Sequence, residues 1–236
     1  MTLCQQVRSG VHTRLFEARE LLNAINGEEA ERTSLSLPST YSTTLRGLTY
    51  ISIYGAIEYA VIQGTQAFIN YLCGLSVNTK HLEHALYSVA LDSQLSSARD
   101  ASPKKKWETR RKIFSALESR SICNIPDNVF GTFLHNVYPQ TIEEIFSCLG
   151  INKDPTFSGR DIGYFKEITE QRNAVAHGRE AASDVGKGLT SNDIQNRIDA
   201  TYRICSYFLD VLDEHATELR FVRSRYRAAY RVRAEA

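Results

Sequence analysis

An arginine and a histidine five residues apart could together cleave a phosphodiester. Residues 167–178 read EITEQRNAVAHG, which places Arg172, Asn173 and His177 close together on one predicted helix. An imidazole titrates near neutral pH, so His177 can act as a base or an acid. The guanidinium of Arg172 is a permanent cation whose planar fork fits phosphate oxygens. Asn173 can donate a hydrogen bond to phosphate or orient the histidine.

The position of Arg172 on the helix predicts a partner for it. On a helical wheel Arg172 lies inside an apolar arc, where an unpaired guanidinium would be costly. Glu58 is the matching anomaly, because it lies in the most apolar segment of the chain. We therefore expect the two side chains to face each other, with part of the Arg172 fork open to solvent; the alternative role is an ion pair that fixes helix register. The arc comprises Ile162, Phe165, Ile168 and Val175.

The spacing of the motif favours a homodimer. Arg172 and His177 are separated by roughly 140° around the helix and about 7.5 Å along it, so they point in different directions within one copy. Two copies packed about a two-fold axis could bring both sets to one shared site. The alternative for His177 is a helix-end histidine that interacts favourably with the C-terminal dipole, and Gly178 directly after it is consistent with that role.

These residues resemble the HEPN domains. The segment RNAVAH, residues 172–177, fits the R-x4–6-H motif of that family, with a polar residue directly after the arginine. The run LTYISIYGAIE, residues 48–58, is similar to the second helix of the RiboL-PSP branch, in which an aromatic-rich run leads into a glutamate. Helix order and chain length agree as well, whereas residues 74–155 have no residue-by-residue match.

The resemblance implies a metal-independent RNA endonuclease, of the toxin or anti-phage type, that is active as a homodimer. RNA carries its own nucleophile, the 2′-hydroxyl, so the catalytic set would be Arg172, Asn173, His177 and Glu58, with neither metal nor cofactor. Expected partners are RNA, a second copy of the chain and an antitoxin or sensor protein. The alternative is a non-catalytic HEPN scaffold in a defence complex; a third hypothesis is a purely structural helical adaptor.

Hydrophobic periodicity predicts an all-α fold that positions these residues. We expect a bundle of long antiparallel helices in a single domain over 1–236, with a smaller helical section inserted at 74–155. The expected helices are 4–26, 43–72, 79–97, 105–119, 140–150, 159–178 and 191–226, with a further short helix after Pro126. Thr190 or Ser191 is expected to cap the last helix, and residues 179–190 before it are expected to form a flexible loop.

Charge is distributed unevenly along the chain. The stretches 104–112 and 220–233 hold twelve of the 28 Lys and Arg residues and one of the 27 acids. The second stretch, a basic extension over 220–236, interleaves arginines with Phe221, Tyr226 and Tyr230. This composition is equally consistent with binding to single-stranded RNA, with a frayed and solvated helix end, and with a tail that docks on a protein partner. The predicted RNA-binding set is Arg220, Arg223, Arg225 and Arg227 of this extension, together with Arg179, two residues after His177. The stretch 104–112, with Trp107, favours a solvated helix face over an RNA track.

The remaining composition indicates a protein of a reducing, cytoplasmic compartment. The five cysteines are scattered and include no C-x-x-C pair. His81, Glu83 and His84 lack further ligands in helical register, so no metal site is expected. Polar residues interrupt the longest apolar stretch, 48–72, which argues against a membrane span.

Overall fold

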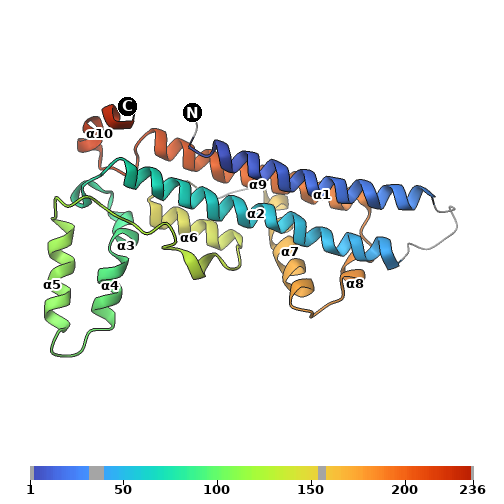
Figure 1. Ribbon diagram of the computed structural model, residues 1–236, viewed down its shortest axis with the longest axis horizontal. Coiled ribbons are helices and arrows are strands. Elements are labelled where there is room, and N and C mark those ends of the chain that lie inside the picture. The colour runs from blue at the N-terminus through green and yellow to red at the C-terminus, as the bar shows by residue number, and fades with distance from the viewer. Residues whose placement is uncertain (1–2, 32–39, 154–157, 235–236) are drawn as a thin grey trace.

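The computed structural model describes residues 3–31, 40–153 and 158–234, and these form an all-helical bundle (Figure 1). Three long helices lie side by side: α1 (Gln5–Glu31), α2 (Thr40–Gly74) and α9 (Ser191–Thr217). The helix α1 runs opposite to α2 and α9, which run in the same direction (Figure 1). The all-α prediction is therefore confirmed, although only α1 is antiparallel to its neighbours.

Apolar residues three or four apart build the core and explain why these segments are helical. On α1 the stripe of Val7, Val11, Leu15, Ala18 and Leu22 is buried, and Ile25 extends it. The helix α2 is buried around most of its circumference, as its composition predicts, and it contacts α1, α7, α8 and α9. No helix of the described ranges is long and apolar enough to cross a membrane.

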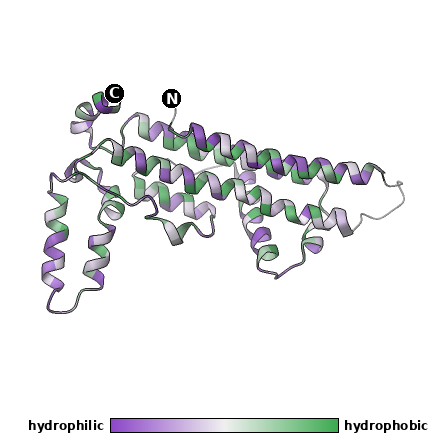
Figure 2. Ribbon diagram, viewed as in Figure 1, coloured by the Kyte–Doolittle hydropathy of each residue, from purple (hydrophilic) through white to green (hydrophobic). Residues whose placement is uncertain are grey.

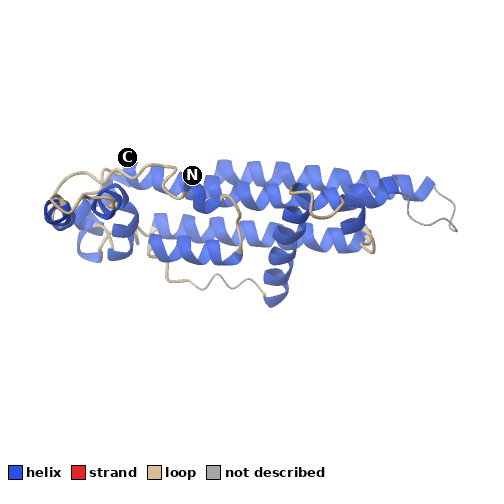
Figure 3. Ribbon diagram, turned by 90° about the horizontal axis from the view of Figure 1, so that it is seen from below, coloured by secondary structure: helices blue, strands red, loops and turns tan. Residues whose placement is uncertain are grey.

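Two shorter helices lie on this core. The helix α6 (Pro139–Leu149) ends at Gly150, whose positive φ of 72° closes the helix as predicted. The helix α7 (Gly159–Ala176) starts at the N-cap Ser158 and crosses the long helices steeply (Figure 3). Thr190 caps α9 through a capping box with Asp193, which confirms the predicted start of that helix.

Four predicted boundaries are wrong. The helix α1 does not end at residue 26 but continues through Gly27 to Glu31. The segment 79–97 is broken into short turns, α3 (Tyr87–Ala90) and α4 (Asp92–Arg99), because extended residues at its start pair with other segments while Leu82 and Leu86 are fully buried. The expected loop at 179–190 contains α8 (Ala182–Gly186), docked on α2. The last helix stops at Thr217, where Leu219 adopts a positive φ of 51°, and the chain turns into α10 (Arg227–Ala234).

The middle section carries a helical hairpin that stands out from the bundle. It consists of α4 and α5 (Lys106–Leu117), and neither helix contains a buried residue. Figure 1 shows the pair projecting away from the long helices, and Figure 2 shows hydrophilic residues toward its tip. The rest of the section returns to the core through a short turn at Gly131–Leu134, after Pro126, and then α6.

Candidate active site at the crossing of α2 and α7

Ion pairs fix α7 against its neighbours. Asp161 near its start pairs with Arg203 of α9 at 2.6 Å, and Glu167 pairs with Arg197 of α9 at 2.6 Å. The hydrogen bond from Arg203 holds the pKa of Asp161 below its ordinary value. Tyr50 of α2 donates a hydrogen bond to Glu167 at 2.5 Å, which joins the three helices. The last turn of α7, with the motif, is thereby held at a defined place beside α2.

The structure brings Arg172 and Glu58 together, as predicted from their apolar surroundings. Nη2 of Arg172 lies 3.8 Å from Oε1 of Glu58, across the interface of α7 and α2. The guanidinium carbon lies 4.4 Å from the ring centroid of Tyr54, one turn before Glu58, an arrangement that favours the cation. The Arg172 side chain is 20% exposed and that of Glu58 is 29% exposed, so the pair is open to solvent rather than sealed.

A loop from the middle section completes the surroundings of the guanidinium. Nη1 of Arg172 donates to Oδ1 of Asn136 at 3.2 Å and to Oδ1 of Asn173 at 2.8 Å. The amide of Asn173 donates in turn to the Tyr138 hydroxyl at 3.3 Å. Asn173 is thereby oriented by the arginine and a tyrosine, and three of the four predicted catalytic residues, Arg172, Asn173 and Glu58, share one polar network.

Sequence reasoning missed Asn136 and Tyr138. They precede α6 in a segment without helical periodicity, and nothing in their spacing relates them to α7. The loop is fastened to the crossing at Val137, whose N–H donates to the Tyr54 hydroxyl at 2.8 Å and whose carbonyl accepts from the Thr169 hydroxyl at 3.0 Å. These two bonds place the Asn136 amide against Arg172.

His177 lies just beyond the last turn of α7. It is the C-cap residue, its backbone N–H donates to the carbonyl of Asn173 at 3.1 Å, and its side chain is exposed. Within the described ranges its imidazole makes no hydrogen bond, so it does not cap the helix carbonyls. Gly178 then adopts a φ of 67° and ends the helix. The structure thus places His177 on the same helix end as Arg172, but outside the polar network.

A surface hollow of about 420 Å³ lies beside the network. Arg179, from the predicted RNA-binding set, lines it together with Tyr138 and Gln171. The Oε1 atom of Gln171 is buried without a hydrogen-bond partner in the described chain. Arg179 is therefore adjacent to the motif, whereas the other predicted RNA-binding arginines are not: the run 220–233 lies at the opposite end of the molecule (Figure 1).

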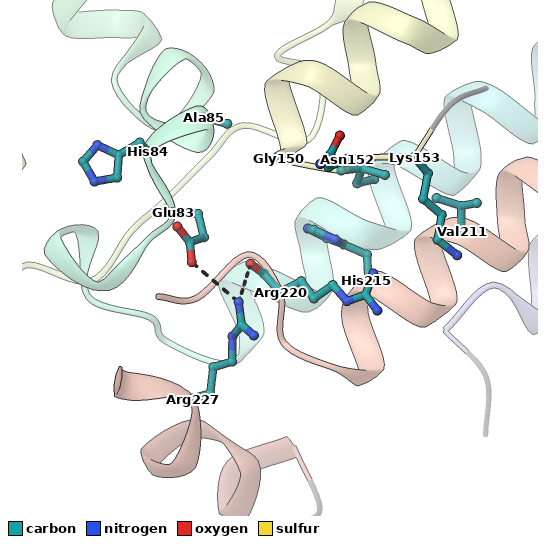
Figure 4. A pocket seen from close by; sticks show the side chains of 11 residues that line it. Glu83, His84, Ala85, Gly150, Asn152, Lys153, Val211, His215, Arg220 and Arg227 are labelled. Carbon is teal, nitrogen blue, oxygen red and sulfur yellow. Dashed lines mark hydrogen bonds and ion pairs between the residues drawn. The ribbon is translucent and has the colours of Figure 1, made fainter. Parts of the chain in front are cut away.

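At that far end, arginines line a second hollow of about 380 Å³ (Figure 4). Arg227 donates to the carbonyls of Val222 and Arg220 and lies 3.5 Å from Glu83. Arg220 pairs with Glu214 at 3.1 Å and with Glu218 at 2.5 Å.

Other residues of the run are also used within the fold. Arg223 donates to the Leu82 carbonyl and the Tyr87 hydroxyl. Phe221 and Tyr230 are buried, which removes two of the three aromatic rings from stacking with a base in this conformation, while Arg225 is exposed. The segment is thus a docked element of the fold. RNA binding by these arginines stays a prediction.

The fold is an all-helical bundle, and at the crossing of α2 and α7 it carries Arg172 in a polar network, with His177 exposed at the same helix end. Residues 5–221 match the family described as MAE_28990-like HEPN, so the chain belongs to the HEPN family. Membership indicates a nuclease or RNA-related function in general. No curated protein and no solved structure matches the chain. In the described ranges, no three His, Cys, Asp or Glu residues are grouped as a metal site would need.

Proposed function

We propose that this protein is a metal-independent RNA endonuclease that cleaves through attack of the 2′-hydroxyl. The observation that carries the proposal is the state of Arg172, which is held in place by Glu58, Asn136 and Asn173 and yet keeps part of its fork open. A preorganised cation of this kind stabilises the charge that develops on a phosphorane. The exposed, unbonded imidazole of His177 is available for proton transfer.

The reaction needs no nucleophile from the protein. His177 takes the proton of the 2′-hydroxyl, whose oxygen attacks the adjacent phosphorus, and the bond to the 5′-oxygen breaks as that oxygen receives a proton. Arg172 binds the non-bridging oxygens, Asn173 orients the guanidinium through its Oδ1 and can add a hydrogen bond to phosphate, and Glu58 holds the guanidinium. The products are a 2′,3′-cyclic phosphate, or a 3′-phosphate after hydrolysis, and a 5′-hydroxyl. DNA lacks the 2′-hydroxyl and is not cleaved.

We place the site at a homodimer interface, because one helix cannot point Arg172 and His177 at the same phosphate. The face of α2 that leads to Glu58 supports this arrangement. Leu48 is 37% exposed and Ile51 is 39% exposed, and a Cβ on Gly55 would meet no atom within 4 Å. An open apolar face beside the polar network suits a second copy of the chain.

The finer identity is part of the same proposal. The run 48–58 that ends in Glu58 supports the RiboL-PSP-like branch, and a ribonuclease of that branch would act in the cytoplasm as a toxin or anti-phage effector, with an antitoxin or sensor protein to restrain it. The whole chain would act as one domain, with RNA contacts from Arg179 beside the site.

Cleavage in EDTA tests the activity. Purified wild type and His177→Ala are incubated with total RNA and with DNA of matched sequence, and the product ends are identified. We expect RNA cutting by the wild type alone, with 2′,3′-cyclic phosphate and 5′-hydroxyl ends, and intact DNA. His177 is exposed, so the variant keeps its thermal midpoint. Cutting by both proteins alike would exclude His177 from the reaction.

The mass in solution tests the dimer. Leu48→Asp combined with Ile51→Asp should give a monomer by light scattering and abolish cutting, because two carboxylates cannot be buried in an apolar interface. Val232→Asp, at an exposed valine of α10, is the control and should change neither mass nor cutting. An active monomeric double variant would contradict the composite site.

One observation favours the alternative, a non-catalytic HEPN scaffold. Nη1 of Arg172 is already engaged by two asparagine side chains, as in a structural arginine. Equal and negligible cutting by the wild type and His177→Ala, with the dimer intact, would support the scaffold.

A further inference from the structure

The α4–α5 hairpin contributes nothing to the core. Neither helix has a buried residue, and the pair projects from the bundle at the end away from α7 and α8 (Figure 1). A helix in a globular protein is stabilised mainly by burying one face. In this hairpin each helix has only a narrow inner face, where it contacts the other helix. On α5 this face contains the partly buried Ile113, Ala116 and Leu117.

The large aromatic residues of α5 lie on its outer face. Trp107 is 65% exposed and Phe114 is 69% exposed. At 100° per residue both lie about 160–180° from Ala116 and about 100–120° from Ile113. They are seven residues apart, about 10.5 Å along the helix, and Arg110 and Arg111 lie between them. At this exposure Trp107 does not anchor its own helix to the bundle. Two large aromatic rings exposed on one helix form the kind of apolar surface that marks an interaction site.

Most cations of residues 104–112 have no ion pair within the described chain, whereas most arginines at the C-terminal end bind their own chain. Residues 104–112 hold six cations and one acid, and the rest of the chain is net acidic. One pair is satisfied, Lys112 with Glu108 at 2.7 Å. No ion pair to a described carboxylate engages the other five cations, Lys104, Lys105, Lys106, Arg110 and Arg111. Lys106 and Arg110 instead flank the Trp107 ring, at 5.8 and 5.2 Å from its centroid.

We propose that the α4–α5 hairpin is a binding arm for single-stranded RNA. Bases stack on Trp107 and Phe114, and the free cations contact the phosphates on either side. The charge of the arm is complementary to a polyanion, and its two aromatic rings are separated by arginines rather than joined into the contiguous apolar centre that a protein partner needs. The choice of RNA as ligand rests on the proposed ribonuclease function, for which the arm would retain substrate outside the cleavage site.

Binding to a labelled single-stranded RNA of about 20 nucleotides, followed by anisotropy in EDTA, tests the arm. All proteins are full-length and carry His177→Ala, so the RNA stays intact. We expect Trp107→Ala with Phe114→Ala to weaken binding about tenfold or more. Arg110→Gln with Arg111→Gln should weaken it and reduce the magnitude of the salt slope by about 1.4, because each phosphate contact to a single strand contributes about 0.7. The controls are Phe16→Ala and the pair Arg19→Gln with Lys187→Gln, at exposed positions elsewhere, and thermal midpoints check folding.

The outcomes separate the arm from the nuclease. Unchanged RNA affinity in both arm variants would overturn the arm, even if the wild type cuts RNA. If RNA binding depends on the hairpin but the wild type cuts no RNA, the proposed RNA-binding role of the hairpin is supported and the proposed nuclease activity is contradicted. A third probe, polyglutamate, reports an acidic protein ligand: tight binding that depends on the arm, with RNA affinity insensitive to Trp107 and Phe114, would also overturn the proposal.

Discussion

The two ends of the bundle use the same residue types in opposite ways. At the α2–α7 crossing Arg172 lies over Tyr54 and beside Glu58, and at the other end Arg223 lies near Tyr87 and Arg227 beside Glu83. By sequence the second region is the richer in arginine. Its composition predicts that this region binds a polyanion. In the structure, however, most of its arginines bind groups of their own chain.

The difference lies in what accepts the hydrogen bonds. Arg172 is held by side-chain oxygens of Asn136, Asn173 and Glu58, which can rotate when a ligand competes. Arg223 and Arg227 donate to backbone carbonyls, which are fixed by the fold. An arginine bound to carbonyls acts as a cross-link between segments, whereas one held by side chains remains available. The type of acceptor therefore distinguishes an arginine that is available to a ligand from a structural one better than the local density of basic residues does.

Arg172→Lys should have the largest effect if the first region is catalytic. Lysine keeps the charge but cannot reproduce the planar fork, so we expect cleavage to fall by about 10²–10³-fold. Initial rates on a defined RNA measure it. Arg160→Lys, at an exposed arginine at the start of the same helix, is the matched control and should keep full activity. Full activity of the Arg172→Lys variant would show that Arg172 is a structural arginine, as Arg223 and Arg227 are at the other end.

Gly47→Ala should disrupt the packing behind the first region. A Cβ there would lie 1.9 Å from the carbonyl oxygen of Ala182, so α8 must move away from α2. We expect a loss of about 3 kcal/mol in the free energy of unfolding. The control is Gly27→Ala, in open space within α1, which should gain up to about 1 kcal/mol. Chemical denaturation measures both, and equal stabilities would contradict the close contact of α2 and α8.

His215 makes the second region sensitive to acid. Burial lowers its pKa to about 4, although its hydrogen bond with the Leu149 carbonyl acts in the other direction. The unfolded chain then binds the proton more readily, so stability is full above the ordinary pKa near 6.5 and falls as the pH drops toward 4, by at most roughly 3 kcal/mol. His215→Gln keeps a donor but does not titrate. Its urea midpoint should change less between pH 7 and 4.5, and parallel curves would contradict the assignment.

Arg223→Ala should have the smallest effect, confined to stability. It removes bonds to the Leu82 carbonyl and the Tyr87 hydroxyl, at a cost of about 1–2 kcal/mol. Arg225→Ala, two residues away and exposed, should change stability by less than about 0.5 kcal/mol. Thermal unfolding of both variants checks this, and the reverse order would mean that Arg223 does not cross-link these segments.

Hydrophobic periodicity predicts those features of the fold that depend on one continuous buried face of a helix. The stripe of α1, the capping of α9 by Thr190 and the pairing of Glu58 with Arg172 follow from the sequence because each is set within one helix or by one costly burial. The breaks at 79–97 and after Thr217 were missed because contacts between distant segments, such as the bridge of Leu82 with Val222, override helical propensity. Asn136 and Tyr138 were missed for the same reason: their role exists only once the loop meets α7.

The bonds of Val137 to Tyr54 and Thr169 carry a consequence for engineering. The loop that supplies Asn136 belongs to the section between α2 and α7, which also carries the projecting hairpin and would be the obvious stretch to trim. A shortened protein built from the three long helices and α7 alone would lose the amide that orients the guanidinium. Any minimal version must therefore keep residues 135–149, with α6 as their anchor, even if the projecting hairpin is removed.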